Sequence, residues 1–310
     1  MKLSSEHKPV VSENISKTFG QVTALQNISF ETERGEMFGV IGPDGAGKTT
    51  LFRILATLLV QTSGNAFVDG YDVKGDFRKI REIIGYMPGR FSLYGDLSVE
   101  ENLNFFASIF KVNPKENYYL IKDIFHQLEP FRNRKASALS GGMKQKLALS
   151  CALIHKPSVL FLDEPTTGVD PVSRREFWQM LDRLKAVGIT IIVSTAYMDE
   201  ALLCDRIALM KNGIMLGVDS PAGMVASYNN KLLAVKGDDM HSILKVLRDI
   251  EVVKSAYSFG HEHHAAISPD FGGDAVEKIS QELTARGIND ALVKRINPSV
   301  EDCYMELSAK

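Results

Sequence analysis

A glycine-rich stretch that directly follows a short apolar run is the part of the sequence best suited to chemistry. The apolar run is Met37 to Ile41, and the stretch after it reads Gly42-Pro43-Asp44-Gly45-Ala46-Gly47-Lys48-Thr49-Thr50. Glycines at this spacing let backbone N–H groups curl around phosphates, and the start of a following helix favours negative charge. We therefore expect a phosphate-binding loop (P-loop) in which Lys48 reaches the β- and γ-phosphates of a nucleotide and Thr49 ligates Mg²⁺.

A second apolar run, Val159 to Leu162, is followed directly by two carboxylates, Asp163 and Glu164. The carboxyl ends of parallel strands meet at one edge of a sheet, so we expect both side chains beside the P-loop. Asp163 is then predicted to be a Mg²⁺ ligand, and Glu164 the general base that activates water. An acidic surface turn is the alternative, which the nearby P-loop makes the weaker interpretation.

A third motif lies upstream of the acidic pair, and we call it the signature segment: Leu139-Ser140-Gly141-Gly142-Met143. Its serine and glycine N–H groups would open a helix and so form an anion site. With the P-loop, the acidic pair and Gly168-Val169-Asp170, this motif order resembles the ATP-binding cassette (ABC) ATPases over about residues 9 to 220. The resemblance implies ATP and Mg²⁺ as cofactors, and a dimer in which the signature segment faces the γ-phosphate held by the other subunit.

Two further residues take their expected roles from this resemblance. Phe19 stands where the family stacks an aromatic ring on adenine, with a core aromatic at a strand end as the alternative. Asp170 stands at the dimer interface of the family. Because Pro171 follows it, Asp170 is equally suited to be the N-cap of a helix.

The chain departs from the family pattern at two positions. Gly89 replaces a Gln and Ala196 replaces a His, both of which normally touch the metal, the attacking water or the γ-phosphate. Shifting the alignment restores neither residue, because the sequence has no Gln from 62 to 126 and no His from 156 to 240. Loss of one prepositioned polar group costs on the order of 10²- to 10³-fold in rate. We expect ATP binding to survive and hydrolysis at this chain's own site to be weak.

The elements that must position these motifs are short β-rich runs separated by helical patterns. The runs at 37–41, 159–162 and 189–193 are bounded by Gly, Pro or Asp, as in a buried parallel sheet. The predicted fold is therefore α/β: a P-loop NTPase core of the ABC type with an inserted helical subdomain at about 90–150. A strand-helix-strand-strand-helix-strand order after residue 229 predicts a small C-terminal α+β module, ferredoxin-like. The predicted domains are 1–229 and 230–310.

Composition restricts the class of partner. The 310 residues are 45% hydrophobic and 24% charged, and 36 Lys plus Arg against 38 Asp plus Glu give a net charge of -2. No basic field exists to hold nucleic acid, so we expect no nucleic-acid partner. The sequence contains no run of about 18 apolar residues, so we expect no membrane span. The first ten residues lack the apolar core of a secretory signal.

The resemblance is closest to bacterial export ATPases of the multidrug and daunorubicin-resistance type. The tail Asn297-Pro298-Ser299-Val300-Glu301-Asp302-Cys303-Tyr304 looks like the end of such subunits, and Gly42 to Gly45 and Tyr86 to Pro88 look like the first half of tandem two-cassette ATPases. This implies a peripheral place on the cytoplasmic face of the inner (cell) membrane. It also implies a separate permease docked near Phe91 to Leu103. Phe91, Leu93 and Tyr94 are the contact candidates, and packing in the core is an equally good interpretation of these three residues.

Three assemblies remain open at this point. The chain could form a homodimer, or it could be the nucleotide-binding partner in an asymmetric heterodimer with another ABC ATPase. A soluble ABC ATPase of translation or chromosome maintenance is the third possibility, although those usually have two cassettes or a long coiled-coil insertion. The run His261-Glu262-His263-His264 lies at a predicted hairpin turn, and we interpret it as a solvated edge rather than a metal site.

Overall fold

The computed structural model describes residues 7–90 and 92–309, and they divide into two compact units. The first unit runs to Pro221 and the second begins at Ala222. The division falls inside α7 (Pro221–Ala226), upstream of the boundary predicted at residue 229. Met224 of α7 belongs with the second unit because its side chain is buried and its carbonyl oxygen accepts a hydrogen bond from the Cys303 thiol at 3.3 Å.

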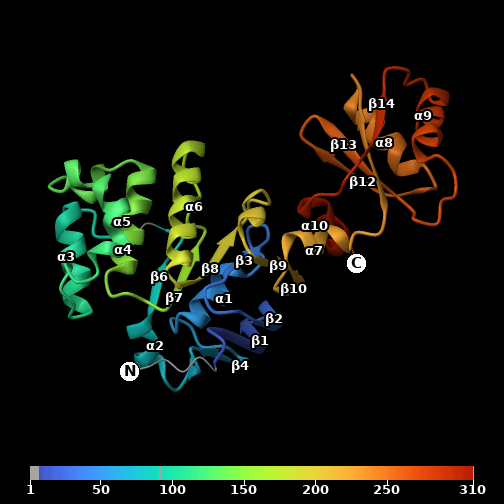
Figure 1. Cartoon of the computed structure of the whole chain (residues 1–310). Coiled ribbons are helices and arrows are strands. Elements are labelled where there is room, and N and C mark those ends of the chain that lie inside the picture. Colours follow the sequence, from blue (N-terminus) through green and yellow to red (C-terminus); the bar gives the residue numbers. More distant parts are fainter. Residues whose placement is uncertain (1–6, 91, 310) are drawn as a thin grey trace. The chain divides into compact units, whose positions relative to one another are not determined.

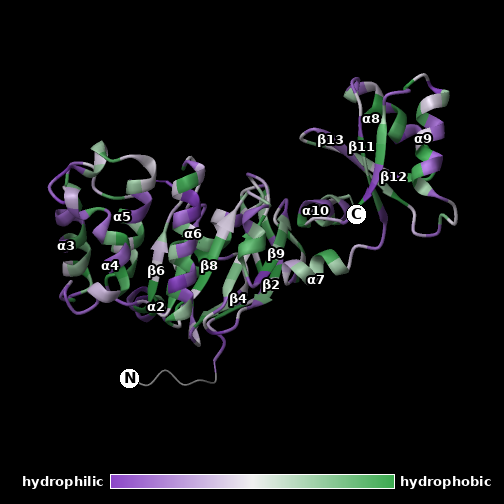
Figure 2. Ribbon diagram, turned by 45° about the horizontal axis from the view of Figure 1, so that its top comes forward, coloured by the Kyte–Doolittle hydropathy of each residue, from purple (hydrophilic) through white to green (hydrophobic). Residues whose placement is uncertain are grey.

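A six-stranded sheet in the order β10-β9-β3-β8-β7-β6 forms the centre of the first unit (Figure 1). Its strands are β3 (Met37–Ile41), β6 (Ile84–Met87), β7 (Val159–Asp163), β8 (Thr190–Thr195), β9 (Arg206–Lys211) and β10 (Ile214–Asp219). All neighbours pair in parallel except β10 with β9. Every residue of β3, β7 and β8 is buried, as expected for strands covered on both faces, and β8 and β9 are coloured as hydrophobic in Figure 2. The predicted parallel sheet is confirmed.

A smaller antiparallel sheet in the order β2-β1-β4-β5 shares its core with the first. It consists of β1 (Val10–Phe19), β2 (Val22–Glu31), β4 (Ser63–Val68) and β5 (Tyr71–Asp72). Phe30 of β2 stacks on Phe38 of β3, with ring centroids 5.1 Å apart. The helix α1 (Lys48–Leu55) packs into the same core, where Phe52 meets Phe161 of β7 edge-on. The start of α1 is thereby fixed at the end of β3.

Helices fill the chain between β6 and β7, as the helical spacing predicts. They are α3 (Val99–Ile109), α4 (Tyr118–His126) and α5 (Gly141–Leu153), with single 3₁₀ turns at Glu129–Phe131 and Ala136–Ala138. Two more helices of this unit, α2 (Phe77–Ile83) and α6 (Pro171–Ala186), lie before β6 and after β7. A capping box of Ser98 and Glu101 fixes the start of α3. Among the residues that the structure describes, no helix has the length and apolar character needed to cross a membrane.

The second unit has the predicted strand-helix-strand-strand-helix-strand order. Its elements are β11 (Lys231–Lys236), α8 (Met240–Asp249), β12 (Val253–Phe259), β13 (Glu262–Ile267), α9 (Ala275–Ala285), β14 (Leu292–Ile296) and α10 (Val300–Ser308). The sheet order β12-β13-β11-β14, with every pair antiparallel, is the arrangement of a ferredoxin-like module. Apolar side chains of β11, β13, α8 and α9 form its own core.

The predicted solvated edge at residues 261–264 is wrong for two of its histidines. His263 is only 3% exposed, and its ring nitrogens lie 3.1 Å from the Ser258 hydroxyl and 2.6 Å from the Met240 carbonyl oxygen. His264 projects to the other face of β13, where its Nδ1 lies 2.7 Å from Asp302 of α10. The strand is covered by a helix that comes much later in the chain.

Candidate functional site

The P-loop connects β3 to α1 in a conformation that only its glycines adopt without strain. Gly45 and Gly47 have φ angles of +79° and +102°, and Gly47 is the N-cap of α1. A Cβ at Gly42 would lie 2.2 Å from the carbonyl oxygen of Met210, so the loop also passes tightly against β9. Lys48 folds back over the loop, and its ammonium donates to the carbonyl oxygens of Gly42 (2.7 Å) and Pro43 (3.0 Å).

A cavity of about 380 Å³ opens in front of this loop. Gly45 to Thr50 and Glu164 line it, whereas Pro43 and Asp44 lie on the exposed outer turn of the loop and do not. Five lining residues come from outside the predicted motifs: Val22, Thr23, Ala24, Asn212 and Gly213.

Asn212 and Gly213 form the turn between β9 and β10, with φ angles of +48° and +77°. The Gly213 N–H donates to the Ala46 carbonyl oxygen at 2.9 Å, and its own carbonyl accepts from Gln26 at 2.8 Å. An Asn-Gly pair between apolar runs is a sequence signal for a hairpin turn. The sequence could therefore have predicted the turn, but not its position against the P-loop.

Asp163 ends β7 with its carboxylate facing α1. Oδ1 accepts hydrogen bonds from Thr49 Oγ1 at 3.1 Å and from Ser194 Oγ at 2.7 Å. Burial raises the pKa of Asp163, and these two hydrogen bonds offset part of that shift. A buried carboxylate beside a hydroxyl is the kind of hard oxygen pair that Mg²⁺ binds, so Thr49 and Asp163 fit that ion. Ser194, which sequence reasoning missed, is the neighbour of Asp163 in the β7–β8 pairing.

Glu164 has a φ of +51°, in the left-handed region that a glutamate rarely adopts. Its N–H is held by the carbonyl oxygen (3.1 Å) and the hydroxyl (3.0 Å) of Ser194. Its carboxylate forms an ion pair with Lys48, the Oε1–Nζ distance being 3.0 Å. The structure therefore brings together Lys48, Thr49, Asp163 and Glu164, as the P-loop and acidic-pair motifs require.

Of the two positions that depart from the family, Gly89 lines a cavity at this site, whereas Ala196 lines neither cavity. Gly89 lines a second cavity of about 510 Å³ with Thr49, Arg53, Pro88, Arg90, Asp163 and Glu164. A Cβ at Gly89 would be 3.0 Å from the Asp163 carbonyl oxygen, so the backbone approaches β7 closely there. Ala196 follows the last residue of β8 and is half-buried. Neither position offers a polar side chain to a nucleotide.

The signature segment lies at the start of α5. Ser140 is the N-cap and accepts a hydrogen bond from the Met143 N–H at 3.3 Å, and Leu139 before it is buried. Gly141 is exposed. Gly142 is buried so closely that a Cβ there would lie 2.7 Å from the Ser173 hydroxyl of α6. The N–H groups at the start of this helix have the arrangement that an anion site needs, and the expected role of the segment stays a prediction.

Asp170 caps α6, as its place before Pro171 predicts. Its Oδ1 accepts from the N–H groups of Val172 (3.1 Å) and Ser173 (3.0 Å), and such bonds hold the pKa of Asp170 below its usual value. A Cβ at Gly141 would lie 3.5 Å from the Gly168 carbonyl oxygen. The turn that leads to Asp170 is thus adjacent to the signature segment.

Phe19 ends β1 with 48% of its surface exposed. It pairs with Val22 across the β1–β2 turn, and Val22, not Phe19, lines the cavity in front of the P-loop. The Lys17 ammonium lies 5.0 Å from the centroid of the Phe19 ring. The exposed part of the ring is accessible to a base. The expected stacking of Phe19 on adenine stays a prediction.

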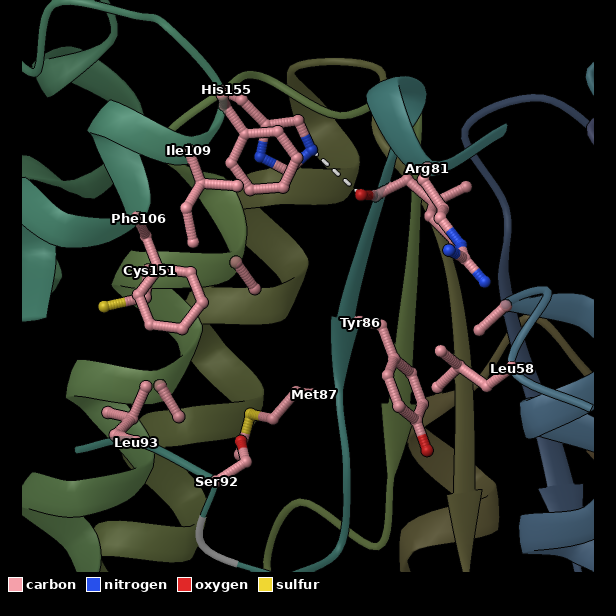
Figure 3. Close-up of a pocket in the computed structure, with 15 residues that line it drawn as sticks. Leu58, Arg81, Tyr86, Met87, Ser92, Leu93, Phe106, Ile109, Cys151 and His155 are labelled. Carbon is pink, nitrogen blue, oxygen red and sulfur yellow. Dashed lines mark hydrogen bonds between the residues drawn. The ribbon is translucent and has the colours of Figure 1, made fainter. Parts of the chain in front are cut away.

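An apolar groove of about 350 Å³ lies between β6 and the helices that follow it (Figure 3). Figure 3 shows Leu93, Phe106, Ile109 and Cys151 on one side of it and Tyr86 and Leu58 on the other. Of the three predicted permease contacts, Leu93 lines the groove, and Tyr94 is exposed beside it, packed against Phe105. Phe91 lies outside the described residues.

Comparison with known proteins agrees with this geometry. The ABC transporter family model matches residues 25–167. The probable multidrug ABC transporter ATP-binding protein YbhF of Escherichia coli is 42% identical over 224 residues, 71% of this chain and 39% of that protein. The chain thus spans about two fifths of that relative. The linearmycin resistance ATP-binding protein LnrL of Bacillus subtilis is 30% identical over 305 residues, 96% and 98% of the two chains.

A solved structure shows the same fold. The cassette MJ0796, described as a dimer in a post-hydrolysis state with ADP and Pi, has a TM-score of 0.61 at 28% identity. The match covers 68% of this chain and 98% of the MJ0796 chain. The P-loop, the acidic pair and the signature segment stand on this fold in their expected order, and a relative matches nearly the whole chain. The chain belongs to the ABC transporter family of ATP-binding proteins, the ABC ATPases, and its relatives carry the names of drug-export and drug-resistance subunits.

Proposed function

We propose that this chain is the ATP-binding subunit of an exporter, that it hydrolyses ATP slowly at its own site, and that its signature segment completes a faster site on a partner cassette. The observation that carries the proposal is an asymmetry within one chain. The chain has the residues expected for binding ATP and for serving a partner, whereas Gly89 and Ala196 bring no polar side chain to the chain's own site.

Binding follows from the P-loop. Lys48 and the N–H groups of Gly45 to Thr49 hold the phosphates, and Thr49 and Asp163 hold Mg²⁺, which when bound neutralises phosphate charge. Glu164 is the general base for the attacking water. Lys48 is paired with Glu164 in this structure, so the lysine must exchange its carboxylate partner for phosphate when ATP binds.

Slow hydrolysis follows from the missing side chains. A glycine hydrogen and an alanine methyl can neither orient water nor donate a hydrogen bond to the γ-phosphate. The two departures leave the residues of the signature segment unchanged. Ser140 and Gly141 are exposed at the start of α5 and so accessible to a partner. Such a division of roles favours a heterodimer over a homodimer of two slow sites.

ATPase assays with and without the cognate second cassette test this proposal. We expect feeble turnover by the isolated chain and a clear gain on adding the partner. Gly141→Asp, which directs a carboxylate at the partner's γ-phosphate, should harm the complex more than Glu164→Gln in this chain. Turnover of about 1 to 10 s⁻¹ by the isolated chain, a rate typical of enzymes, would instead favour a conventional homodimer.

We further propose that the apolar groove of Figure 3 receives a segment of the membrane permease, which would place the chain at the cytoplasmic face of the membrane. The groove is lined mostly by apolar and aromatic side chains, and Ile109 at its edge is exposed. An apolar groove with an exposed apolar edge is typical of a surface that binds a partner helix.

A charge in the groove tests the docking. Ile109→Asp should lower co-purification with the permease, while affinity for ATP stays the same because Ile109 lies outside the nucleotide cavities. Val187→Asp, at another exposed aliphatic position just after α6 and outside the groove, is the matched control and should leave both unchanged. Equal losses in the two variants would argue against the groove as the docking site.

A further inference from the structure

Glu200 is a buried carboxylate that no part of the proposed chemistry uses. It begins a 3₁₀ turn (Glu200–Leu203) after β8, and only 1% of its surface is exposed. A buried carboxylate is costly unless hydrogen-bond donors and an opposite charge surround it. Three side chains from three separate segments supply these partners.

Two of the partners are threonine hydroxyls. Thr195, the last residue of β8, donates to Oε2 at 2.5 Å, and Thr166, in the turn after Glu164, donates to Oε1 at 2.7 Å. Both threonines are themselves buried. One carboxylate therefore ties the strand end before Ala196 to the turn that follows Glu164.

The third partner is Arg174 in the first turns of α6. Its Nε lies 3.7 Å from Glu200 Oε1, and its guanidinium lies 4.1 Å from the centroid of the Tyr197 ring. Among the described residues this buried Nε has no hydrogen-bond partner, so the charge of Glu200 is its main compensation. The loop from Ala196 to Glu200 is thereby attached to α6.

Backbone hydrogen bonds extend the network in both directions. The Thr195 carbonyl oxygen accepts from the N–H of Gly42, the first residue of the P-loop, at 3.2 Å. The Thr166 carbonyl oxygen accepts from the N–H of Val169 at 3.1 Å, next to Asp170, the N-cap of α6. A continuous series of contacts thus runs from the P-loop through Glu200 to Asp170.

We propose that Glu200 is a positioning residue that joins the P-loop, the loop carrying Ala196 and the start of α6 into one unit, so that ATP binding moves the turn at Asp170. Ala196 has no polar side chain to contact the nucleotide, so this network around Glu200 is the route between nucleotide and partner. The inference rests on the proposed function only for the identity of the partner that contacts Asp170.

The chain contains its own reporter for this coupling. Trp178 is the single tryptophan, it is buried in α6, and it follows Arg174 by one helical turn on the same side. Its emission therefore responds to a shift of α6 against the rest of the unit. A fluorescent ATP analogue measures nucleotide affinity separately.

The test compares Thr195→Val and Thr166→Val, which keep the side-chain shape but remove the hydroxyl, with Thr195→Ser, which keeps the hydroxyl. In the parent protein and in Thr195→Ser, ATP·Mg²⁺ should shift the Trp178 emission. In the two valine variants the shift should fall to less than about half, with affinity for ATP changed by no more than about twofold. Asp249→Asn, an exposed carboxylate that pairs with Arg286 in the second unit, is the charge control and should behave as the parent does.

A purely structural role of Glu200 gives a different result. It would lower the melting temperature of the valine variants while the folded protein kept the full Trp178 response, and that outcome overturns the proposal. A parent protein that binds ATP with no change in Trp178 emission overturns it as well. The measurement needs no partner, so it is independent of whether the asymmetric ATPase model holds. The two valine variants leave Glu200 itself in the chain and keep the side-chain shape at each position, so we expect them to fold.

Discussion

The ammonium group of Lys48 lies 3.0 Å from Oε1 of Glu164, so the residue expected to hold phosphate is paired with the expected general base. The side chains are 2% and 23% exposed, which limits screening by water and salt. Phosphate and carboxylate therefore compete for one ammonium group. The ion pair also keeps the charge of Lys48 compensated within the P-loop before nucleotide arrives.

Glu164→Gln should therefore raise the affinity for ATP. Removing an ion pair of about 0.5 to 1 kcal/mol that opposes binding corresponds to roughly a two- to fivefold lower Kd. Isothermal titration with ATP·Mg²⁺ measures it. Glu176→Gln is the matched control, since Glu176 pairs with Lys146 away from the P-loop.

Lys48→Ala should lower affinity for ATP by about tenfold or more, because charge-assisted hydrogen bonds to phosphate are lost. If Lys48→Ala binds as tightly as the parent, the P-loop assignment is wrong.

Restoring the two missing side chains should have unequal effects on hydrolysis. Ala196→His places a donor on a half-buried loop and should raise single-turnover hydrolysis, up to about 10²-fold. Gly89→Gln alone should gain less, because its Cβ would meet the Asp163 carbonyl oxygen at 3.0 Å and push on the end of β7. Phosphate release from each variant measures the rates. A larger gain from Gly89→Gln would show that the close approach relaxes on binding ATP.

Gly142→Ala should destabilise the first unit, whereas Gly141→Ala should fold normally. A Cβ at Gly142 would lie 2.7 Å from Oγ and 2.9 Å from Cβ of Ser173, but one at Gly141 would make only an ordinary contact. Overpacking of this kind costs about 1 to 3 kcal/mol. Thermal unfolding of both variants measures the difference, and equal melting temperatures would contradict the close packing of α5 on α6.

His155 should make stability fall on acidification. Burial lowers its pKa to about 4, against a partly opposing hydrogen bond from Nε2 to the Ile84 carbonyl oxygen at 2.8 Å. The unfolded chain binds this proton near pH 6.5, so the stabilisation is complete above that pH and is lost progressively down to about pH 4. The loss is at most about 3 kcal/mol.

Urea unfolding at pH 7 and pH 5 tests this prediction against His155→Phe. The phenyl ring keeps the stack on Phe110, where the ring centroids are 3.7 Å apart, but does not titrate. The free energy of unfolding should drop more between the two pH values in the parent than in the variant. Identical pH dependence would mean that His155 is hydrated in solution.

The first unit alone should bind ATP. Every residue that lines the two cavities beside the P-loop and the acidic pair lies at or before Gly213, and the division between the units follows Pro221. A chain ending at Pro221 should bind a fluorescent ATP analogue within about twofold of the full chain. A folded truncated chain that fails to bind would give the second unit a part in the site.

Local sequence patterns predicted those parts of the site that are local in the chain. The P-loop, the pair Asp163 and Glu164, and the cap at Asp170 each combine a run of neighbouring residues with the end of one strand or the start of one helix. Their geometry is set within a few residues, so spacing alone indicates it. The parallel sheet was predictable for the same reason, because buried strands are short continuous apolar runs.

Contacts made across the sheet were not predictable in this way. Ser194 reaches Asp163 only because β8 pairs with β7 in a particular register, and Gly213 reaches Ala46 only because the β9–β10 turn lies over the P-loop. His263 and His264 were misassigned because burial at β13 depends on α8 and on α10, the latter far along the chain. A single sequence contains no signal for such pairings.

The position of β3 within its sheet has a consequence for biosynthesis. The neighbours of this strand are β8 and β9, and Met37 pairs with Ile191, so the P-loop strand leaves the ribosome long before either neighbour exists. Contacts this distant in sequence make folding slow and leave apolar strand edges open meanwhile. A nascent chain stalled before residue 190 would hold the complete P-loop and acidic-pair motifs yet lack the strands that shape them. We therefore expect ATP to bind, and so to help complete folding, only late in translation, and both edges of β3 to stay unpaired until then.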